Sequence, residues 1–473
     1  MSNRKRALFL FLFLLPRPLW GKVFVRWTAA TLPGTPLGIR ELVIPWNRNR
    51  TALLHTALAQ GYRVYAEVPV QQVSDAFKWL AKESIEGVVV DAGNGPDAAR
   101  EIEKLRSAHS KVKMLVSLDG KQPQMRGQTV VTRNGVLQVS SPTAQPWLDS
   151  NLAMVRFHQE SRPGETLLYT FAWELKDTLQ QQNGPSVEDY SLAIAESGAI
   201  HADLLLSVHQ KLQKALLDSE PAAWSSWKKL IPYMQFALRD ELDRLHPWSN
   251  VAVIAGDYDT AYEPMNLMAR HNIPFRIVSG EVTERALQGV TLVAALTAPD
   301  QPGIRVLNAF AQEGGTVILV DANGKYPWHS SPPIPAAEHA VSYAAGKGRV
   351  IELSEPVSDP ETFAQDLRRV APKGSTLISL WNALTTTAVP YRDDRNGRVV
   401  VELVNFAEEP MRIQVQVKGV YSSARYETPD RGCCQDLSPV QHDGFTDFVV
   451  PSLAIAGRVH LEAAGSREPS HRK

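Results

Sequence analysis

The chain has 473 residues, and its 50 Lys plus Arg balance 50 Asp plus Glu, so the formal net charge at pH 7 is zero. This length predicts several domains, because a single hydrophobic core stops growing at about 250–300 residues. The balanced charge provides no basic surface for nucleic acid or for an anionic membrane, so we expect neither as a partner.

The amino terminus has the pattern of an export signal. Arg4, Lys5 and Arg6 precede the apolar run 7–15, which is shorter than the roughly 20 residues that cross a bilayer. We therefore expect a cleaved signal peptide over residues 1–21 and a periplasmic or secreted protein, with a retained amino-terminal anchor as the alternative. No other segment of the sequence has the length and apolarity of a span, so we expect none in the mature chain.

Short apolar strands alternate with amphipathic helical patterns from residue 40 to residue 217. This rhythm predicts a parallel sheet, and seven or eight such units predict a (β/α)8-type barrel over residues 22–248. The predicted strands are 41–45, 63–69, 87–91, 113–118, 136–140, 167–173 and 202–208. A further strand at 23–27 would come first, and without it the barrel is incomplete.

Two more domains are predicted after the barrel. Residues 249–372 again alternate strands and helices, which indicates a small doubly wound α/β domain. Residues 373–465 carry short alternating strands with turn signals between them, which is typical of an antiparallel β-sandwich. We expect the polar tail 466–473 to be disordered.

The residues that could ligate a metal do not form a recognisable site. Cys433 and Cys434 are the two cysteines of the chain; because they are adjacent, a vicinal disulfide is the one bridge open to them within the chain. We interpret both as packing or loop residues, and Asp257 and Asp259 as turn and helix-cap residues. The sequence has no HExxH motif, no P-loop and no GxGxxG at a strand-to-helix turn. We expect neither a metal nor a cofactor.

The stretch LLYTFAWE at 167–174 carries the strongest functional signal. It is a continuous apolar and aromatic run, typical of a buried parallel strand, and it ends in Trp173 and Glu174. An acidic residue at the carboxyl end of a barrel strand lies where enzymes of this fold carry out their chemistry. The alternative is that Glu174 starts a loop and faces water.

Glycoside hydrolysis needs two carboxyl groups, about 5–5.5 Å apart in retaining enzymes and roughly 6.5–9.5 Å apart in inverting ones. We predict Glu174 as the nucleophile or base, with Asp91 or Asp119 as its partner. If 23–27 is the first strand, Asp91 ends strand four and Glu174 ends strand seven. If the barrel instead starts at Glu41, Asp119 takes the strand-four position and Glu174 ends strand six. Either Asp could alternatively cap a helix or form a turn.

Aromatic and polar residues near the ends of predicted strands complete the predicted sugar site. Trp46, Trp147 and Trp173 are candidates to stack on the apolar face of a sugar ring, although any one of them taken alone is more often a core residue. Glu67, at a strand end, and Asp149, in a loop, are candidates to bind substrate hydroxyl groups. Asp149 could instead cap the helix that follows.

The order of these domains resembles that of the β-galactosidases of glycoside hydrolase family forty-two and related barrel glycosidases. FAQEGGTVILVD (310–321) is similar to their class I glutamine-amidotransferase-like trimerisation domain. VVVELVNFAEEPMRIQVQV (399–417) and DFVVPSLAIAGRVHLE (447–462) are similar to the terminal sandwich of many bacterial glycosidases. The resemblance implies an exported enzyme acting on a glycan or oligosaccharide, with a middle domain that serves packing or homo-oligomerisation.

Two departures qualify this resemblance. The glycosidases carry an Asn-Glu pair at the end of the fourth strand, and the barrel sequence has none. This favours the alternative, a non-catalytic carbohydrate-binding or scaffold protein on the same architecture. The amidotransferases carry a nucleophilic Cys after a central strand, and the matching LVAALTAPD (292–300) has none. We therefore do not expect glutamine hydrolysis, because no residue supplies the thiolate.

Overall fold

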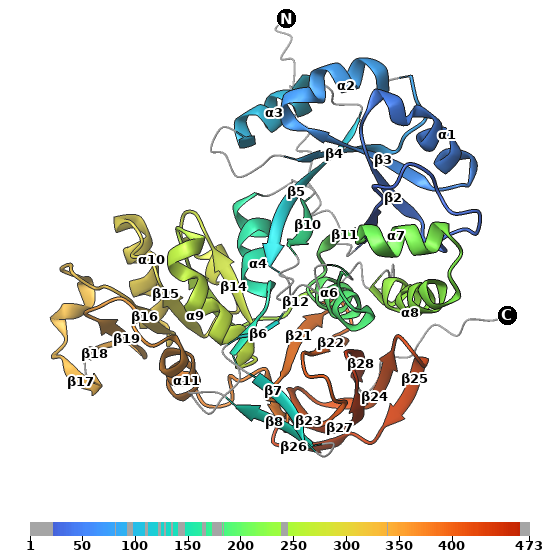
Figure 1. Ribbon diagram of the computed structural model, residues 1–473. Coiled ribbons are helices and arrows are strands. Elements are labelled where there is room, and N and C mark those ends of the chain that lie inside the picture. The colour runs from blue at the N-terminus through green and yellow to red at the C-terminus, as the bar shows by residue number, and fades with distance from the viewer. Residues whose placement is uncertain are drawn as a thin grey trace, which may run out of the picture.

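The computed structural model describes residues 22–463 except for residues 81, 92–97, 109–111, 122–123, 127–128, 134–135, 141–146, 163–166, 173–181, 183, 238–244 and 338. It consists of a closed barrel, a sheet domain with helices, and two antiparallel sheets at the carboxyl end of the chain (Figure 1). This agrees with the predicted fold class. The predicted signal peptide and the polar tail lie outside the described residues.

The barrel is closed by seven parallel strands in the order β1-β11-β10-β5-β4-β3-β2. They are β1 (Val23–Arg26), β2 (Glu41–Pro45), β3 (Arg63–Pro69), β4 (Gly87–Asp91), β5 (Lys113–Lys121), β10 (Leu167–Ala172) and β11 (Asp203–Ser207). The strand expected at 23–27 is therefore part of the barrel, where β1 pairs with β11 and with β2. Because β1 joins β11 directly, the sheet closes with one strand fewer than a (β/α)8 barrel.

Helices cover the outside of this barrel (Figure 1). They are α1 (Thr51–Ala59), α2 (Val73–Leu80), α3 (Ala98–Ala108), α4 (Leu152–Ser161), α6 (Val187–Ala199), α7 (Gln210–Leu217) and α8 (Pro221–Ala237), with the 3-10 turns η1 (Arg48–Arg50) and η2 (Val70–Gln72). Outward strand residues such as Val25, Ile44 and Val64 are buried in one core with the helices. Burial on both faces explains why the strands are continuous apolar runs.

The inside of the barrel is filled in layers. One residue from each strand forms an apolar middle layer, made of Phe24, Val43, Tyr65, Val89, Leu115, Leu168 and Leu205. Side chains in a strand alternate between the two faces, so residues two positions earlier belong to the amino-terminal floor and residues two positions later to the mouth. The floor positions include the charged residues Glu41, Arg63, Lys113 and Asp203.

The long connection between β5 and β10 corrects one predicted strand. Residues Val136–Ser140 form β8, which pairs with β7 (Thr129–Arg133) in an antiparallel hairpin outside the barrel sheet. A second ribbon joins β6 (Gln124–Arg126) to β9 (Trp147–Asp149). The prediction of 136–140 as a barrel strand is therefore wrong, because its local pattern indicates a strand but cannot identify the partner.

This correction changes the strand numbering of the candidate acids. Asp91 ends the fourth barrel strand, as the first numbering predicted. Glu174 comes after the sixth strand, β10, rather than after the seventh. Asp119 lies within β5, which continues to Lys121, rather than at its end.

The middle domain is a mixed sheet in the order β14-β13-β15-β16-β19-β18-β17. Its strands are β13 (Val251–Ile254), β14 (Phe275–Val278), β15 (Leu292–Ala295), β16 (Thr316–Leu319), β17 (Ile334–Ala337), β18 (Ala340–Ala345) and β19 (Gly348–Leu353), and its helical segments are α9 (Tyr258–Arg270), η4 (Arg285–Leu287), α10 (Gln301–Gln312), η5 (Pro327–Ser330) and α11 (Pro360–Val370). Alternate residues of β13 enter two separate cores, one for each face of the sheet. This is the expected doubly wound arrangement, and Asp257 caps α9 by accepting the backbone N–H of Thr260, as predicted.

Two antiparallel sheets share the carboxy-terminal core. One has the order β12-β21-β22-β28-β24-β25 and the other β20-β23-β27-β26. Their strands are β12 (His246–Pro247), β20 (Ile378–Trp381), β21 (Thr386–Arg392), β22 (Val399–Asn405), β23 (Met411–Lys418), β24 (Tyr421–Thr428), β25 (Gly432–Leu437), β26 (Val440–His442), β27 (Phe445–Leu453) and β28 (Ala456–Ala463). The predicted β-sandwich is confirmed.

The two cysteines lie in a strand rather than in the expected packing or loop positions. Cys433 and Cys434 belong to β25 at the edge of the sandwich and are bonded to each other. The carboxylate of Glu427 lies near them, with the three potential ligand atoms within 4.8 Å of one another. Sulfurs that are bonded to each other supply no thiolate for a metal.

Candidate functional site

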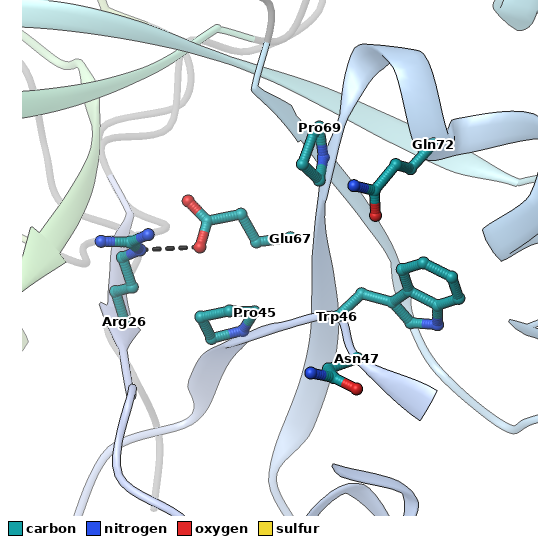
Figure 2. A pocket seen from close by; sticks show the side chains of 7 residues that line it. All are labelled: Arg26, Pro45, Trp46, Asn47, Glu67, Pro69 and Gln72. Atoms are coloured by element: carbon teal, nitrogen blue, oxygen red, sulfur yellow. Dashed lines mark hydrogen bonds and ion pairs between the residues drawn. The ribbon is translucent and has the colours of Figure 1, made fainter. Parts of the chain in front are cut away.

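A pocket of about 540 Å³ opens at the carboxyl ends of β1, β2 and β3 (Figure 2). It is lined by Arg26, Pro45, Trp46, Asn47, Glu67, Pro69 and Gln72. These residues lie at the mouth of the barrel, beyond the apolar middle layer. Active sites of parallel barrels are found at this end, because the loops that follow the strands meet there.

An ion pair between Arg26 and Glu67 forms the charged part of the pocket. Arg26 Nε donates to Glu67 Oε2 at 2.7 Å, and the two side chains are 36% and 10% exposed. Each residue comes two positions after a member of the middle layer, Phe24 or Tyr65, and so faces the barrel axis. The pair fixes the carboxylate and leaves its second oxygen without a protein partner among the described residues.

An aromatic and amide group forms the other part of the pocket. Figure 2 shows the Glu67 carboxylate turned toward Arg26, whereas the Trp46 indole points the other way, toward the side on which Gln72 lies. The backbone N–H of Trp46 donates to the carbonyl of Glu67 at 2.7 Å, which extends the pairing of β2 with β3. Asn47 caps the turn η1 by accepting the N–H of Asn49. The pocket thus combines a fixed ion pair with an apolar ring and amides, groups that suit a sugar's hydroxyls and its C–H face.

The loop after β1 is held by a buried glutamine. Gln213 of α7 accepts the backbone N–H groups of Thr28 and Ala29 at 2.9 and 2.8 Å. Its amide donates to the Thr28 hydroxyl and to the Val208 carbonyl. Because all these groups are buried or half-buried, the loop that follows Arg26 has one defined position.

The structure brings two of the predicted site residues, Trp46 and Glu67, into this pocket. The backbone of Asp91 lies opposite Pro69 of the pocket lining and opposite Ser117 of β5. Asp119 lies opposite Thr170 of β10. The strands that carry or precede the candidate acids are thus neighbours around the rim, in the order β3, β4, β5 and β10.

The remaining predicted residues fall partly outside the described part of the chain. Trp147 and Asp149 belong to β9, which pairs with β6 outside the barrel sheet. Trp173 and Glu174 lie outside the described residues. Asn151 occupies the N-cap position of α4, and its side chain donates to Glu196.

Sequence reasoning missed Arg26, Asn47 and Gln72 as parts of the pocket. Arg26 is the last residue of the strand VFVR. A charged residue at the carboxyl end of an otherwise apolar barrel strand was the available signal. Asn47 directly follows Trp46, so the same strand end pointed to it. Gln72 lies in the turn η2 and had no distinguishing pattern.

Comparison with solved structures identifies the class of fold. An α-L-fucosidase, isoenzyme 2 from Paenibacillus thiaminolyticus, is similar with a TM-score of 0.59 and 11% identity, over 94% of this chain and 99% of that one. A cold-adapted β-galactosidase from Rahnella sp. R3 is similar with a TM-score of 0.54 and 9% identity, over 95% and 99% of the two chains. The protein therefore shares with these two structures the fold of a parallel barrel followed by a β-sandwich.

The likeness does not extend to sequence. No protein-family model matches the chain, and no curated protein matches it. None of the helices in the described part of the chain combines the length and apolar character that a bilayer crossing requires.

Proposed function

We propose that this protein is an exported glycoside hydrolase that binds a glycan or oligosaccharide at the mouth of its barrel. The observation that carries the proposal is the pocket in which Trp46, Glu67 and Arg26 meet at the carboxyl ends of the strands. The architecture, shared with a fucosidase and a β-galactosidase, supports the same reaction class. Kinship with glycoside hydrolase family forty-two remains part of this proposal.

The catalytic pair is proposed among Glu174, Asp91 and Asp119, with Glu67 and Trp46 binding substrate. Neighbouring strands are about 4.8 Å apart, and strands one further apart about 10 Å. Carboxyl side chains that extend from such strands into one pocket can approach to the separations that glycosidases use. One carboxyl group would protonate the leaving oxygen, and the other would attack the anomeric carbon or activate water.

Glu67 has a defined task in this proposal. Its Arg26-bound oxygen orients the carboxylate, and the other oxygen accepts a hydrogen bond from a sugar hydroxyl. The guanidinium contributes its remaining N–H donors to a neighbouring hydroxyl. Trp46 supplies a face for the apolar side of a sugar ring on the adjoining part of the pocket.

A non-catalytic carbohydrate-binding protein is the second candidate. Among the described residues that line the pocket, Glu67 is the sole carboxylate, and it is paired with a cation rather than with a second acid. Such a pocket binds sugars without cleaving them if no strand-end acid joins it.

Hydrolysis of a panel of aryl glycosides and of plant and bacterial oligosaccharides by the purified protein tests both candidates. We expect Glu174→Gln to abolish cleavage with folding unchanged. We expect Glu67→Gln to raise KM about tenfold or more, because a charge-assisted hydrogen bond to substrate is worth roughly 1.5–3 kcal/mol. Asp75→Asn, which changes an exposed acid on α2, is the matched control. Sugar binding without cleavage across the whole panel would establish the second candidate.

A further inference from the structure

The four-stranded sheet of the sandwich has an exposed outer face that is separate from the barrel pocket. Along β23, Ile413, Val415 and Val417 are buried in the sandwich core, whereas Gln414 is exposed and Gln416 half-buried. Burial in β27 alternates in the same way, with Phe448 and Val450 buried. The side chains between the buried ones therefore form one outward surface.

Trp381 lies on this surface with its side chain open to solvent. It ends the edge strand β20, is 46% exposed and lies opposite Gln414 of β23. Nearby Leu384 is 57% exposed. An indole is costly to leave in water, and a tryptophan this exposed beside amides offers a flat apolar platform with hydrogen-bonding groups at its edge.

A fixed row of polar side chains crosses the same face. Gln416 lies opposite Ser379 on β20 and opposite Asp447 on β27. Gln416 Nε2 donates to Asp447 Oδ1 at 3.0 Å, and His442 Nε2 lies 3.0 Å from Asp447 Oδ2. These hydrogen bonds hold the amide and the imidazole in place, so a ligand meets donors and acceptors that are already ordered.

We propose that this outer face, defined by Trp381, Gln414, Gln416, Asp447 and His442, is a second glycan-binding surface for a neutral oligosaccharide or polysaccharide. A sugar ring stacks its C–H side on the indole, and its hydroxyl groups pair with the row of amide, carboxylate and imidazole. From β20 to β27 the face spans two strand spacings, about 10 Å, so the ligand is a chain rather than a single ring. The surface would hold a polymer while the barrel pocket engages one segment of it.

This inference goes beyond the proposed hydrolysis and does not depend on it. Binding at the sandwich requires no carboxylate pair, and Trp381 lies in a different domain from the pocket. The two sites can therefore be tested separately with variants of the full chain.

The test is affinity electrophoresis of the full chain in native gels that contain soluble polysaccharides, with sedimentation on insoluble ones. Trp381→Ala and Gln416→Ala are compared with the control Ile334→Ala, which removes a 57% exposed apolar side chain from the middle domain. We expect about tenfold weaker retention by at least one glycan for Trp381→Ala, because stacking and apolar contact are lost together. Gln416→Ala should weaken retention less, and Ile334→Ala should be retained as the wild type is.

Three results would overturn the proposal. One is wild-type retention that Trp381→Ala does not change. Another is failure of every glycan to retain the wild type. The third is a change from dimer to monomer in Trp381→Ala by light scattering, since Trp381 would then cover a second copy of the chain. Hydrolysis of a small aryl glycoside should be the same in Trp381→Ala as in the wild type, so loss of the proposed hydrolysis remains distinguishable from loss of this surface.

Discussion

Ionisation of Asp203 at the floor of the barrel should destabilise the protein as pH rises. The carboxyl accepts the backbone N–H of Lys22 at 2.8 Å. Burial raises the pKa of Asp203 to about 7, against the lowering effects of that N–H and of the Lys113 charge. Above this pH the fold must hold a charge at a half-buried position.

The magnitude follows from the difference between the folded and unfolded pKa values. An unfolded Asp titrates near 3.9, so between about pH 4 and pH 7 the folded protein keeps a proton that the unfolded chain has lost. The folded state binds more protons in this window, and the free energy of unfolding therefore falls as pH rises through it. About 3 pH units correspond to ~4 kcal/mol, and because Asp203 is half-buried we expect solvent screening to leave about 1–2 kcal/mol.

The variant Asp203→Asn isolates this contribution, because its amide oxygen can still accept the Lys22 N–H. We expect the variant to match the wild type near pH 4.5 and to be more stable by about 1–2 kcal/mol at pH 8. Urea unfolding followed by the fluorescence of the buried Trp27 and Trp227 reports on the barrel. An equal difference at both pH values, or a variant less stable at pH 8, would refute the reasoning.

Three further substitutions test the packing around the site and between the domains. Arg458→Met removes the guanidinium from the buried Glu402 carboxylate and leaves, among the described residues, only His201, whose Nε2 is 4.0 Å away. The substitution should lower the free energy of unfolding in urea by about 3–5 kcal/mol, and adding Glu402→Leu should restore most of that loss. Asn151→Ala removes the 2.8 Å hydrogen bond that the side-chain amide donates to Glu196. It should lower the free energy of unfolding by about 1–3 kcal/mol, measured as a lower denaturation midpoint. Gly348→Ala would place a Cβ 2.1 Å from the backbone carbonyl oxygen of Gly315. This clash should lower the free energy of unfolding by on the order of 3 kcal/mol. Limited proteolysis should therefore cleave the middle domain of the variant before the rest of the chain.

The barrel strands could be predicted because each is a local apolar run buried on both faces. The partners of those strands could not, because pairing depends on chain closure rather than on local sequence. Residues 136–140 illustrate this limit: VLQVS alternates well enough for a strand, yet it pairs with the neighbouring Thr129–Arg133 instead of joining the barrel. Counting it as a barrel strand moved Glu174 by one position in the predicted order.

The pocket could be predicted in part for the same reason. Trp46 and Glu67 lie at the ends of recognisable strands, and the carboxyl ends of parallel strands meet at one rim. Arg26 could not be assigned to Glu67 from sequence, because 41 residues and a whole intervening strand separate them. Only closure of the barrel shows that the guanidinium and the carboxylate face one axis.

The register of the rim strands bears on how the candidate acids pair. Asp91 lies opposite Ser117 of β5, so the backbones of Asp91 and Asp119 are separated by one strand spacing and two residues along the strand, about 8 Å. This separation is nearer to the 6.5–9.5 Å between the carboxyl groups of inverting enzymes than to the roughly 5–5.5 Å of retaining ones. The anomer released first therefore tests this pair: we expect inversion if Asp91 and Asp119 act together. Retention would contradict that pairing, because it requires two carboxyl groups about 5–5.5 Å apart.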